Sequence, residues 1–275
     1  MTNTAPLRLA ILGATGRMGH ALVDAVLQNP ALKLSAALAL PGSPGFGADA
    51  GSLVGRPATG VIVGNDLAEA AAAAEVFVDF TRPEGTLAAL DSCVAHGRSI
   101  VIGTTGFDAA QKQHIAAAAL KIPLCMAANF SVGVNICLRL LEVAAKSLGP
   151  GYDVEIVEAH HRGKVDAPSG TALRMGEAVA GALGRKLDDC AIHGRRGTTG
   201  ARDATSIGFA VVRGGDIVGD HSVMFLGEGE RVEISHKASS RANFAQGALR
   251  AALWLRDRVP GHYEMRDVLG LNAPV

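Results

Sequence analysis

Residues 158–172 contain the densest group of side chains able to do chemistry, and they read Glu-Ala-His-His-Arg-Gly-Lys-Val-Asp-Ala-Pro-Ser-Gly-Thr-Ala. Because an imidazole titrates near neutral pH, His160 or His161 can donate a proton under working conditions. Lys164 adds a compact positive charge that suits an anion such as a carboxylate. The segment therefore predicts acid–base chemistry on a negatively charged molecule.

A helix is predicted to begin directly after this run, at Gly170. Ser169 is a natural N-cap, and the amides near Gly170 and Thr171 lie at the helix end that attracts anions. Together with the Thr171 hydroxyl and Lys164, these amides can hold a carboxylate. We expect an anion pocket here, and a merely solvated charged loop is the alternative.

Two other kinds of site fit the segment less well. Zinc needs three or four convergent ligands, whereas adjacent histidines on a strand point to opposite faces and no cysteine lies nearby. We therefore expect no metal. A nucleic-acid surface would accept the basic residues, but the segment lacks interleaved aromatics, and 26 Lys and Arg balance 26 Asp and Glu in the whole chain.

A glycine-rich turn at residues 13–19 reads Gly-Ala-Thr-Gly-Arg-Met-Gly and follows a short apolar run. Such a turn lets backbone amides approach a pyrophosphate, and the helix that follows adds partial positive charge. The spacing is a variant of the dinucleotide fingerprint, with Thr15 at the middle glycine position. Its place between a strand and a helix favours dinucleotide binding over plain packing.

The sequence leaves the choice between NADH and NADPH open. A carboxylate that binds the adenine ribose usually follows the glycines by about 20 residues, but residues 38–41 read Leu-Ala-Leu-Pro. Arg17, inside the turn, could meet a 2′-phosphate or could be an ordinary exposed helix residue.

Two further loops follow predicted strands: residues 103–106, Gly-Thr-Thr-Gly, and residues 127–130, Ala-Ala-Asn-Phe. Ligands of open parallel sheets bind outside the carboxyl ends of the strands, so both loops are placed to reach a nicotinamide. Ordinary turn chemistry is an equally good alternative for each.

The elements that must carry these motifs alternate between strand and helix in the first half of the chain. This alternation predicts an α/β domain with a Rossmann-like, doubly wound parallel sheet. The expected strands are 7–12, 32–38, 76–80, 99–102 and 123–127, and the expected helices are 17–28, 68–74, 84–96 and 108–120.

The pattern changes after residue 130 and predicts a second, α+β domain with a mixed sheet. We expect a dinucleotide-binding domain at 1–130, to which 240–275 returns, and a substrate-binding and oligomerisation domain at 131–239. The expected helices are 134–148, 170–183 and 243–257, and the expected strands are 153–159, 206–212, 221–226 and 231–237.

The composition limits the class of protein. Of 275 residues, 48% are hydrophobic and 19% charged, which suffices for real cores and argues against disorder. The four cysteines, at 93, 125, 137 and 190, form no CxxC pair and suit a reducing cytosol. The sequence has neither a signal-peptide pattern nor an apolar run of about 18 residues, so we expect a cytoplasmic protein without a membrane partner.

The run from His160 to Ala172 closely resembles the signature of the 4-hydroxy-tetrahydrodipicolinate reductase (dihydrodipicolinate reductase) family. Five further stretches resemble the same family in the same order, and the resemblance covers essentially the whole chain. These stretches are residues 13–19, 79–84, 103–107, 127–133 and 236–241.

The resemblance implies roles for individual residues. His160 is implied as the principal acid–base residue, and Lys164 as a proton donor that also binds substrate. The family's acid and arginine after the second strand are replaced by Ala39 and Leu40, which weakens any inference of cofactor preference. The implied substrate contacts are His161, Lys164, Ser169, Gly170 and Thr171, and the implied cofactor contacts are Gly13, Ala14, Thr15, Gly16, Arg17, Met18, Gly103, Thr104, Thr105, Ala127, Ala128, Asn129 and Phe130.

The resemblance also implies the reaction. NADH or NADPH would reduce 4-hydroxy-tetrahydrodipicolinate, via dihydrodipicolinate, to tetrahydrodipicolinate in the diaminopimelate route of lysine biosynthesis. Hydride would reach the ring carbon that lost its hydroxyl, and a proton would reach the adjacent carbon. The resemblance implies a homotetramer, and the balanced charge predicts no nucleic-acid partner.

Two other functions are compatible with parts of this sequence. Another nicotinamide oxidoreductase could share the two-domain plan, although an aldehyde dehydrogenase would need a nucleophilic cysteine in an electropositive setting. A redox-sensing protein could bind the cofactor without turnover, but it would need no proton donor beside the cofactor. The His-His-x-x-Lys run therefore favours the reductase.

Overall fold

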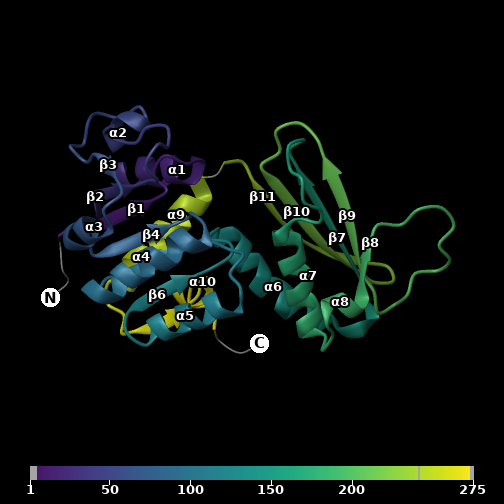
Figure 1. The fold of residues 1–275 in the computed structure, drawn as a ribbon. Helices are drawn as coiled ribbons and strands as arrows, with labels where there is room; N and C mark the ends of the chain where they lie inside the picture. The colour runs from purple at the N-terminus through teal and green to yellow at the C-terminus, as the bar shows by residue number, and fades with distance from the viewer. Residues whose placement is uncertain (1–4, 241, 273–275) are drawn as a thin grey trace. The chain divides into compact units, whose positions relative to one another are not determined.

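The computed structural model describes residues 5–240 and 242–272. Arg241, the last residue of the motif at 236–241, therefore lies outside the described residues. The described chain forms two compact units, each with its own sheet (Figure 1). The first unit contains residues 5–131 and 242–270, and the second contains residues 132–240 with residues 271 and 272.

The first unit is built on a seven-stranded parallel sheet with the order β12-β6-β5-β4-β1-β2-β3. Helices α1 and α9 pack together on one face, and α3, α4 and α5 cover the other (Figure 1). The strands are β1 (Leu7–Leu12), β2 (Leu32–Leu38), β3 (Val63–Gly64), β4 (Val76–Asp79), β5 (Ser99–Ile102), β6 (Pro123–Met126) and β12 (Gly261–Tyr263), and the helices are α1 (Arg17–Leu27), α2 (Ala50–Leu53), α3 (Leu67–Ala73), α4 (Pro83–His96), α5 (Ala109–Ala119), α9 (Ala242–Leu255) and α10 (Met265–Val268).

Strand β1 lies where the strand order reverses, between β2 and β4. The chain builds the sheet outward from β1 on one side and then continues from β4 on the other. In open α/β sheets a ligand binds at this switch point, beyond the carboxyl ends of the strands. The glycine-rich turn after β1 therefore occupies the position expected for a dinucleotide site.

The second unit contains a five-stranded mixed sheet with the order β11-β10-β7-β9-β8. Central strand β7 pairs antiparallel with β10 and parallel with β9. Helices α6 and α7 pack against one another and cover one face of this sheet (Figure 1). The elements are α6 (Val132–Leu148), the short 3-10 helix η1 (Gly149–Gly151), β7 (Asp153–His160), α7 (Gly170–Ala182), α8 (Leu187–Cys190), β8 (Ala191–His193), β9 (Ile207–Arg213), β10 (Gly219–Leu226) and β11 (Arg231–Ala238).

Both sheets confirm the predicted fold class. The sequence did not indicate β3, β8 or β12, because strands of two or three residues are too short to show a period. The predicted strand 221–226 starts two residues after the observed start of β10, since Gly219 and Asp220 are residue types that are rare in strands. Gly219 matters for the site, because it lies beside His160 in the folded unit.

Gly19 lets helix α1 begin close to the end of β1. A Cβ atom at this position would lie 2.7 Å from the backbone of Ala14 and would also meet the carbonyl oxygen of Gly13. Side chains do not approach the backbone this closely, so the third glycine of the turn is required for packing of the helix against the strand.

We expect Gly19→Ala to lower the free energy of unfolding by about 3 kcal/mol, because the added methyl group displaces α1 from its backbone neighbours. Urea unfolding followed by circular dichroism measures the change. Gly181→Ala is the matched control, since Gly181 is also helical but a Cβ there would meet nothing within 4 Å. Equal unfolding free energies for the two variants would contradict the packing argument.

Candidate active site

Two buried polar side chains lie at the end of strand β7. Because strand residues alternate between faces, Glu158 and His160 share a face with the core residues Val154 and Ile156. His160 Nδ1 lies 2.7 Å from Glu158 Oε2. The side chain of His160 is 10% exposed and that of Glu158 is 1% exposed, so water hardly competes for this hydrogen bond.

Glu158 joins three elements of the second unit. Arg213, at the end of β9, donates to both carboxylate oxygens at 2.7 Å, and the amide of Ser169 donates at 3.0 Å. Burial alone would raise the pKa of Glu158, but the hydrogen bonds from Arg213, His160 and Ser169 outweigh burial and lower this pKa. The group is therefore an ionised carboxylate at neutral pH.

Ser169 caps α7, as the sequence predicts. Its Oγ accepts a hydrogen bond from the Ala172 amide at 3.1 Å and lies 2.8 Å from His221 Nε2. The helix continues over 13 residues, which gives its first turn partial positive charge. Gly170 is exposed and space is open where its Cβ would stand, so an anion can approach these amides.

His221 of β10 lies opposite Glu158 in the strand register and packs edge-to-face on His160, with the ring centroids 5.1 Å apart. Burial, and then the charge of His160, lower the pKa of His221 to about 4. This ring is therefore neutral at pH 7. Its Nδ1 is buried and has no hydrogen-bond partner among the residues described.

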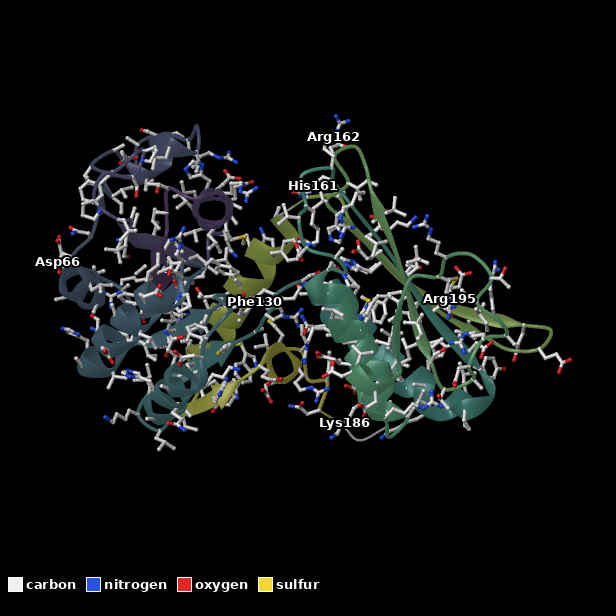
Figure 2. All side chains as sticks on the ribbon, turned by 45° about the vertical axis from the view of Figure 1, so that its right-hand side comes forward. Asp66, Phe130, His161, Arg162, Lys186 and Arg195 are labelled. Atoms are coloured by element: carbon white, nitrogen blue, oxygen red, sulfur yellow. The ribbon has the colours of Figure 1, made fainter. Side chains whose placement is uncertain are left out.

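The loop from His161 to Pro168 carries two more of the predicted substrate residues, His161 and Lys164, while Thr171 lies in the first turn of α7. The His161 amide donates to Ile217 O at 2.7 Å, which ties this loop to the chain entering β10. Lys164 Nζ bonds both carboxylate oxygens of Asp166 at 2.8 Å. Figure 2 shows His161 and Arg162 on this loop, with Arg162 directed outward into solvent.

The glycine-rich turn fits a dinucleotide pyrophosphate. Gly13 has a φ of +66°, a conformation that favours glycine, and its carbonyl accepts from the Gly16 amide at 2.9 Å. Gly16 is the N-cap of α1, and no side chain caps this helix end. The first turn of α1 can therefore present backbone N–H groups to a phosphate.

Asp79 and Phe80, at and just after the end of β4, contact the other two cofactor loops. Asp79, at the end of β4, accepts hydrogen bonds from the hydroxyls of Thr81, Thr86 and Thr104. The Phe80 ring packs edge-to-face on Phe130, with centroids 5.5 Å apart. Thr104 and Phe130 are both buried, so neither side chain offers an exposed surface to a cofactor.

The structure brings the predicted residues into two groups. His160 and Ser169 belong to one hydrogen-bonded network in the second unit, while the cofactor set lies at the carboxyl ends of β1, β5 and β6 in the first. Three residues of this network, Glu158, Arg213 and His221, are not among those predicted from the sequence. Spacing could have indicated Glu158, since it precedes His160 by two strand positions, but Arg213 and His221 come from distant strands that nothing in the sequence pairs with β7.

Within residues 5–240 and 242–272, no cluster of three or more His, Cys, Asp or Glu is arranged to hold a metal ion. No helix in this part of the chain is long and apolar enough to cross a membrane.

Family models match both halves of the chain. The model described as dihydrodipicolinate reductase, N-terminus, matches residues 7–130, and the one described as dihydrodipicolinate reductase, C-terminus, matches residues 133–269. The 4-hydroxy-tetrahydrodipicolinate reductase of Herminiimonas arsenicoxydans is 57% identical over 97% of this chain and 99% of the relative. The protein of that name from Burkholderia cenocepacia (strain J2315) is 59% identical over 97% of this chain and 100% of its own length.

Solved structures show the same architecture. A structure described as dipicolinate-bound dihydrodipicolinate reductase from Paenisporosarcina sp. TG-14 aligns with a TM-score of 0.77 and 26% identity, covering 94% of this chain and 97% of the other. An amine dehydrogenase from Mycobacterium smegmatis aligns with a TM-score of 0.58 and 13% identity, over 95% and 96% of the two chains. The second likeness shows the shared fold alone.

We expect His221 to make the protein less stable in acid. An unfolded histidine binds a proton below about pH 6.5, whereas the buried ring resists protonation until about pH 4. Between these values the unfolded state binds more protons, so stability falls as the pH falls, by roughly 3 kcal/mol from this residue. His236, whose pKa is also lowered by burial, contributes in the same direction.

Urea unfolding of His221→Gln and the wild type at several pH values between 7 and 4 measures this contribution. The glutamine variant should be less sensitive to acid, while His96→Gln, at an exposed position of α4, should keep the wild-type pH dependence. Parallel curves for the wild type and His221→Gln would show that the buried ring does not carry the effect.

Proposed function

The chain belongs to the dihydrodipicolinate reductase family and reduces 4-hydroxy-tetrahydrodipicolinate with NADH or NADPH, and we propose that the β7–α7 site of the second unit holds the substrate. The product is tetrahydrodipicolinate, in the diaminopimelate route of lysine biosynthesis. One observation carries the assignment of the site: a proton donor, His160, and an anion-binding helix end, at Ser169, are joined through the single carboxylate of Glu158.

We assign the substrate carboxylates to Lys164 and the first turn of α7. Gly170 and Thr171 offer backbone amides and a hydroxyl at the positive end of the helix, and Ser169 and His161 complete the set. Lys164 bonds to Asp166, whose side chain is 59% exposed, so a substrate carboxylate can replace this partner at small cost. The dipicolinate named for the Paenisporosarcina structure supports a planar dicarboxylate as the ligand class.

The first unit holds the cofactor in this proposal. The turn formed by Gly13, Ala14, Thr15, Gly16, Arg17 and Met18 fits the pyrophosphate, and the loops 103–105 and 127–130 reach the nicotinamide. When bound, the cofactor supplies a hydride. Ala39 and Leu40 offer the adenine ribose neither an acid nor an arginine, and Leu40 is 78% exposed. Arg17 is then the cation of the turn that a 2′-phosphate would meet.

His160 is assigned as the proton donor. Water is lost from the hydroxylated ring, hydride adds to the carbon that carried the hydroxyl, and the adjacent carbon takes a proton. Each turnover therefore consumes one hydride and one proton. His160 supplies the proton from its ring, while Lys164 and the helix end neutralise the carboxylates and orient the ring.

We also propose that four copies of the chain form a homotetramer. We further propose that the protein is cytoplasmic. On the face of the five-stranded sheet away from α6 and α7, Val157, Ala210, Val212 and Met224 are half-buried or exposed, and Val212 is 49% exposed. Apolar side chains gathered on one face of a sheet support contact with another copy. The cysteines are free thiols, which suits a reducing compartment.

We expect His160→Gln to lower turnover about 10²–10⁴-fold, the contribution of a positioned general acid. Lys164→Ala should lower turnover and raise the KM for substrate, because a carboxylate loses its counter-charge. Oxidation of NADH and of NADPH with freshly generated 4-hydroxy-tetrahydrodipicolinate measures both effects, and the ratio of the two rates gives the cofactor preference.

His96→Gln, on the exposed side of α4, is the control and should keep wild-type turnover. Absence of oxidation with either cofactor, from folded wild-type protein, would exclude the reductase function. Wild-type turnover in both site variants would exclude only the residue assignments.

The mass in solution, from size-exclusion chromatography with light scattering, should equal four chains. Val212→Glu should reduce this mass, because it places a charge on the sheet face assigned to assembly. Val259→Glu, at a 71% exposed position of the first unit, should leave it unchanged. A monomeric wild-type protein would contradict the proposed assembly.

A further inference from the structure

We propose that Glu158 is the positioning residue for His160, because its carboxylate fixes the ring proton on Nδ1 and makes Nε2 the atom that carries the catalytic proton. The inference deepens the proposed function, since it rests on His160 as proton donor. It concerns a residue that touches His160 directly and acts on the reaction through that ring.

The partners of the carboxylate determine the proton position. Glu158 Oε1 accepts from Arg213 Nη2 at 2.7 Å and from the Ser169 amide at 3.0 Å, and Oε2 accepts from Arg213 Nη1 at 2.7 Å. His160 Nδ1 then lies 2.7 Å from Oε2. An ionised carboxylate has no hydrogen to donate, so the hydrogen in this contact belongs to Nδ1.

Arg213 keeps the carboxylate in its ionised form. A protonated Glu158 could donate to Nδ1 and stabilise the opposite tautomer, but a guanidinium offers only donors and pairs with a charged carboxylate. The lowered pKa of Glu158 agrees with this arrangement. Arg213 also donates to Asp166 O at 2.8 Å, so the same side chain holds the loop that carries Lys164.

A side chain at position 219 would crowd the far side of the His160 ring. A Cβ atom at Gly219 would lie 3.0 Å from His160 Nε2, so glycine leaves space beside this nitrogen. The neighbouring ring of His221 is neutral at pH 7, because burial lowers its pKa to about 4. With Nδ1 committed to Glu158, Nε2 is the ring atom that can hold or release a proton.

Glu155 is a matched control on the same strand. Arg195 donates to its two oxygens at 2.9 and 2.8 Å, and Arg202 donates at 2.9 Å. Glu155 precedes Glu158 by three positions, so it faces the opposite side of the sheet, and Figure 2 labels its partner Arg195. Glu155→Gln therefore removes a comparable ion pair without changing the contacts of His160.

The first measurement is the tautomer of His160 in the wild-type protein. The ¹⁵N chemical shifts of histidine-labelled protein distinguish Nδ1–H from Nε2–H at a pH where the ring is neutral, and His160→Gln identifies the signal. We expect hydrogen on Nδ1 and none on Nε2. Glu158→Gln should shift the population toward Nε2–H, and Glu155→Gln should leave it unchanged. An Nε2–H tautomer in the wild type would overturn the proposal.

Turnover is the second measurement. Glu158→Gln should lower kcat on the order of 10²-fold, because the His160 ring remains present but no carboxylate holds its Nδ1–H and directs Nε2 toward the substrate. The KM for the cofactor should stay at its wild-type value, and Glu155→Gln should keep wild-type kcat. Wild-type kcat in Glu158→Gln would show that the carboxylate does not position the proton for catalysis.

The two measurements separate this inference from the proposed function. If His160→Gln keeps full turnover, the role of His160 as proton donor is wrong and so is the catalytic part of the inference, while the wild-type tautomer still decides what Glu158 does to the ring. If Glu158→Gln does not fold, as judged by circular dichroism, the wild-type tautomer alone decides, with Nε2–H overturning the proposal.

Discussion

The site in the second unit depends on the buried ion pair between Glu158 and Arg213. A carboxylate that is 1% exposed is costly to bury unless donors satisfy its oxygens. These donors come from the end of β9, the start of α7 and the end of β7. Removing one partner of such a pair costs about 3–5 kcal/mol. The need to satisfy one charge therefore fixes three elements in their places.

The alternation of β7 explains why this charge lies directly above the core. Val154 and Ile156 contact the helices through the same face that carries Glu158 and His160. The buried face of β7 therefore carries apolar residues in its first half and polar residues at its end, since every second side chain of a strand points to the same face. His221 continues the polar row on β10, next to Val223 and Phe225, which belong to the core. Rigid packing below the site holds its polar groups in one geometry.

The parts of this molecule that could be predicted from sequence are those encoded locally. The turn at 13–19, the cap at Ser169 and the alternation of strands and helices each depend on neighbouring residues. Arg213 and His221 are separated from His160 by 53 and 61 positions, and only the sheet register brings them together. Gly219 could not be predicted as a site residue for the same reason. The need for a glycine at this position is visible only in the fold, where a Cβ atom would crowd the His160 ring.

The two ion pairs of the site differ in a way that matches their roles. In the pair of Glu158 with Arg213 the carboxylate is buried, and loss of either partner would leave the other charge uncompensated. Asp166, in contrast, is 59% exposed, and an ion pair with an exposed partner contributes only about 0–1 kcal/mol. Lys164 can therefore leave Asp166 for a substrate carboxylate at little cost, while His160 keeps its partner throughout. Proton donation requires a fixed geometry and anion binding requires an exchangeable one, and burial of the two carboxylates separates these requirements.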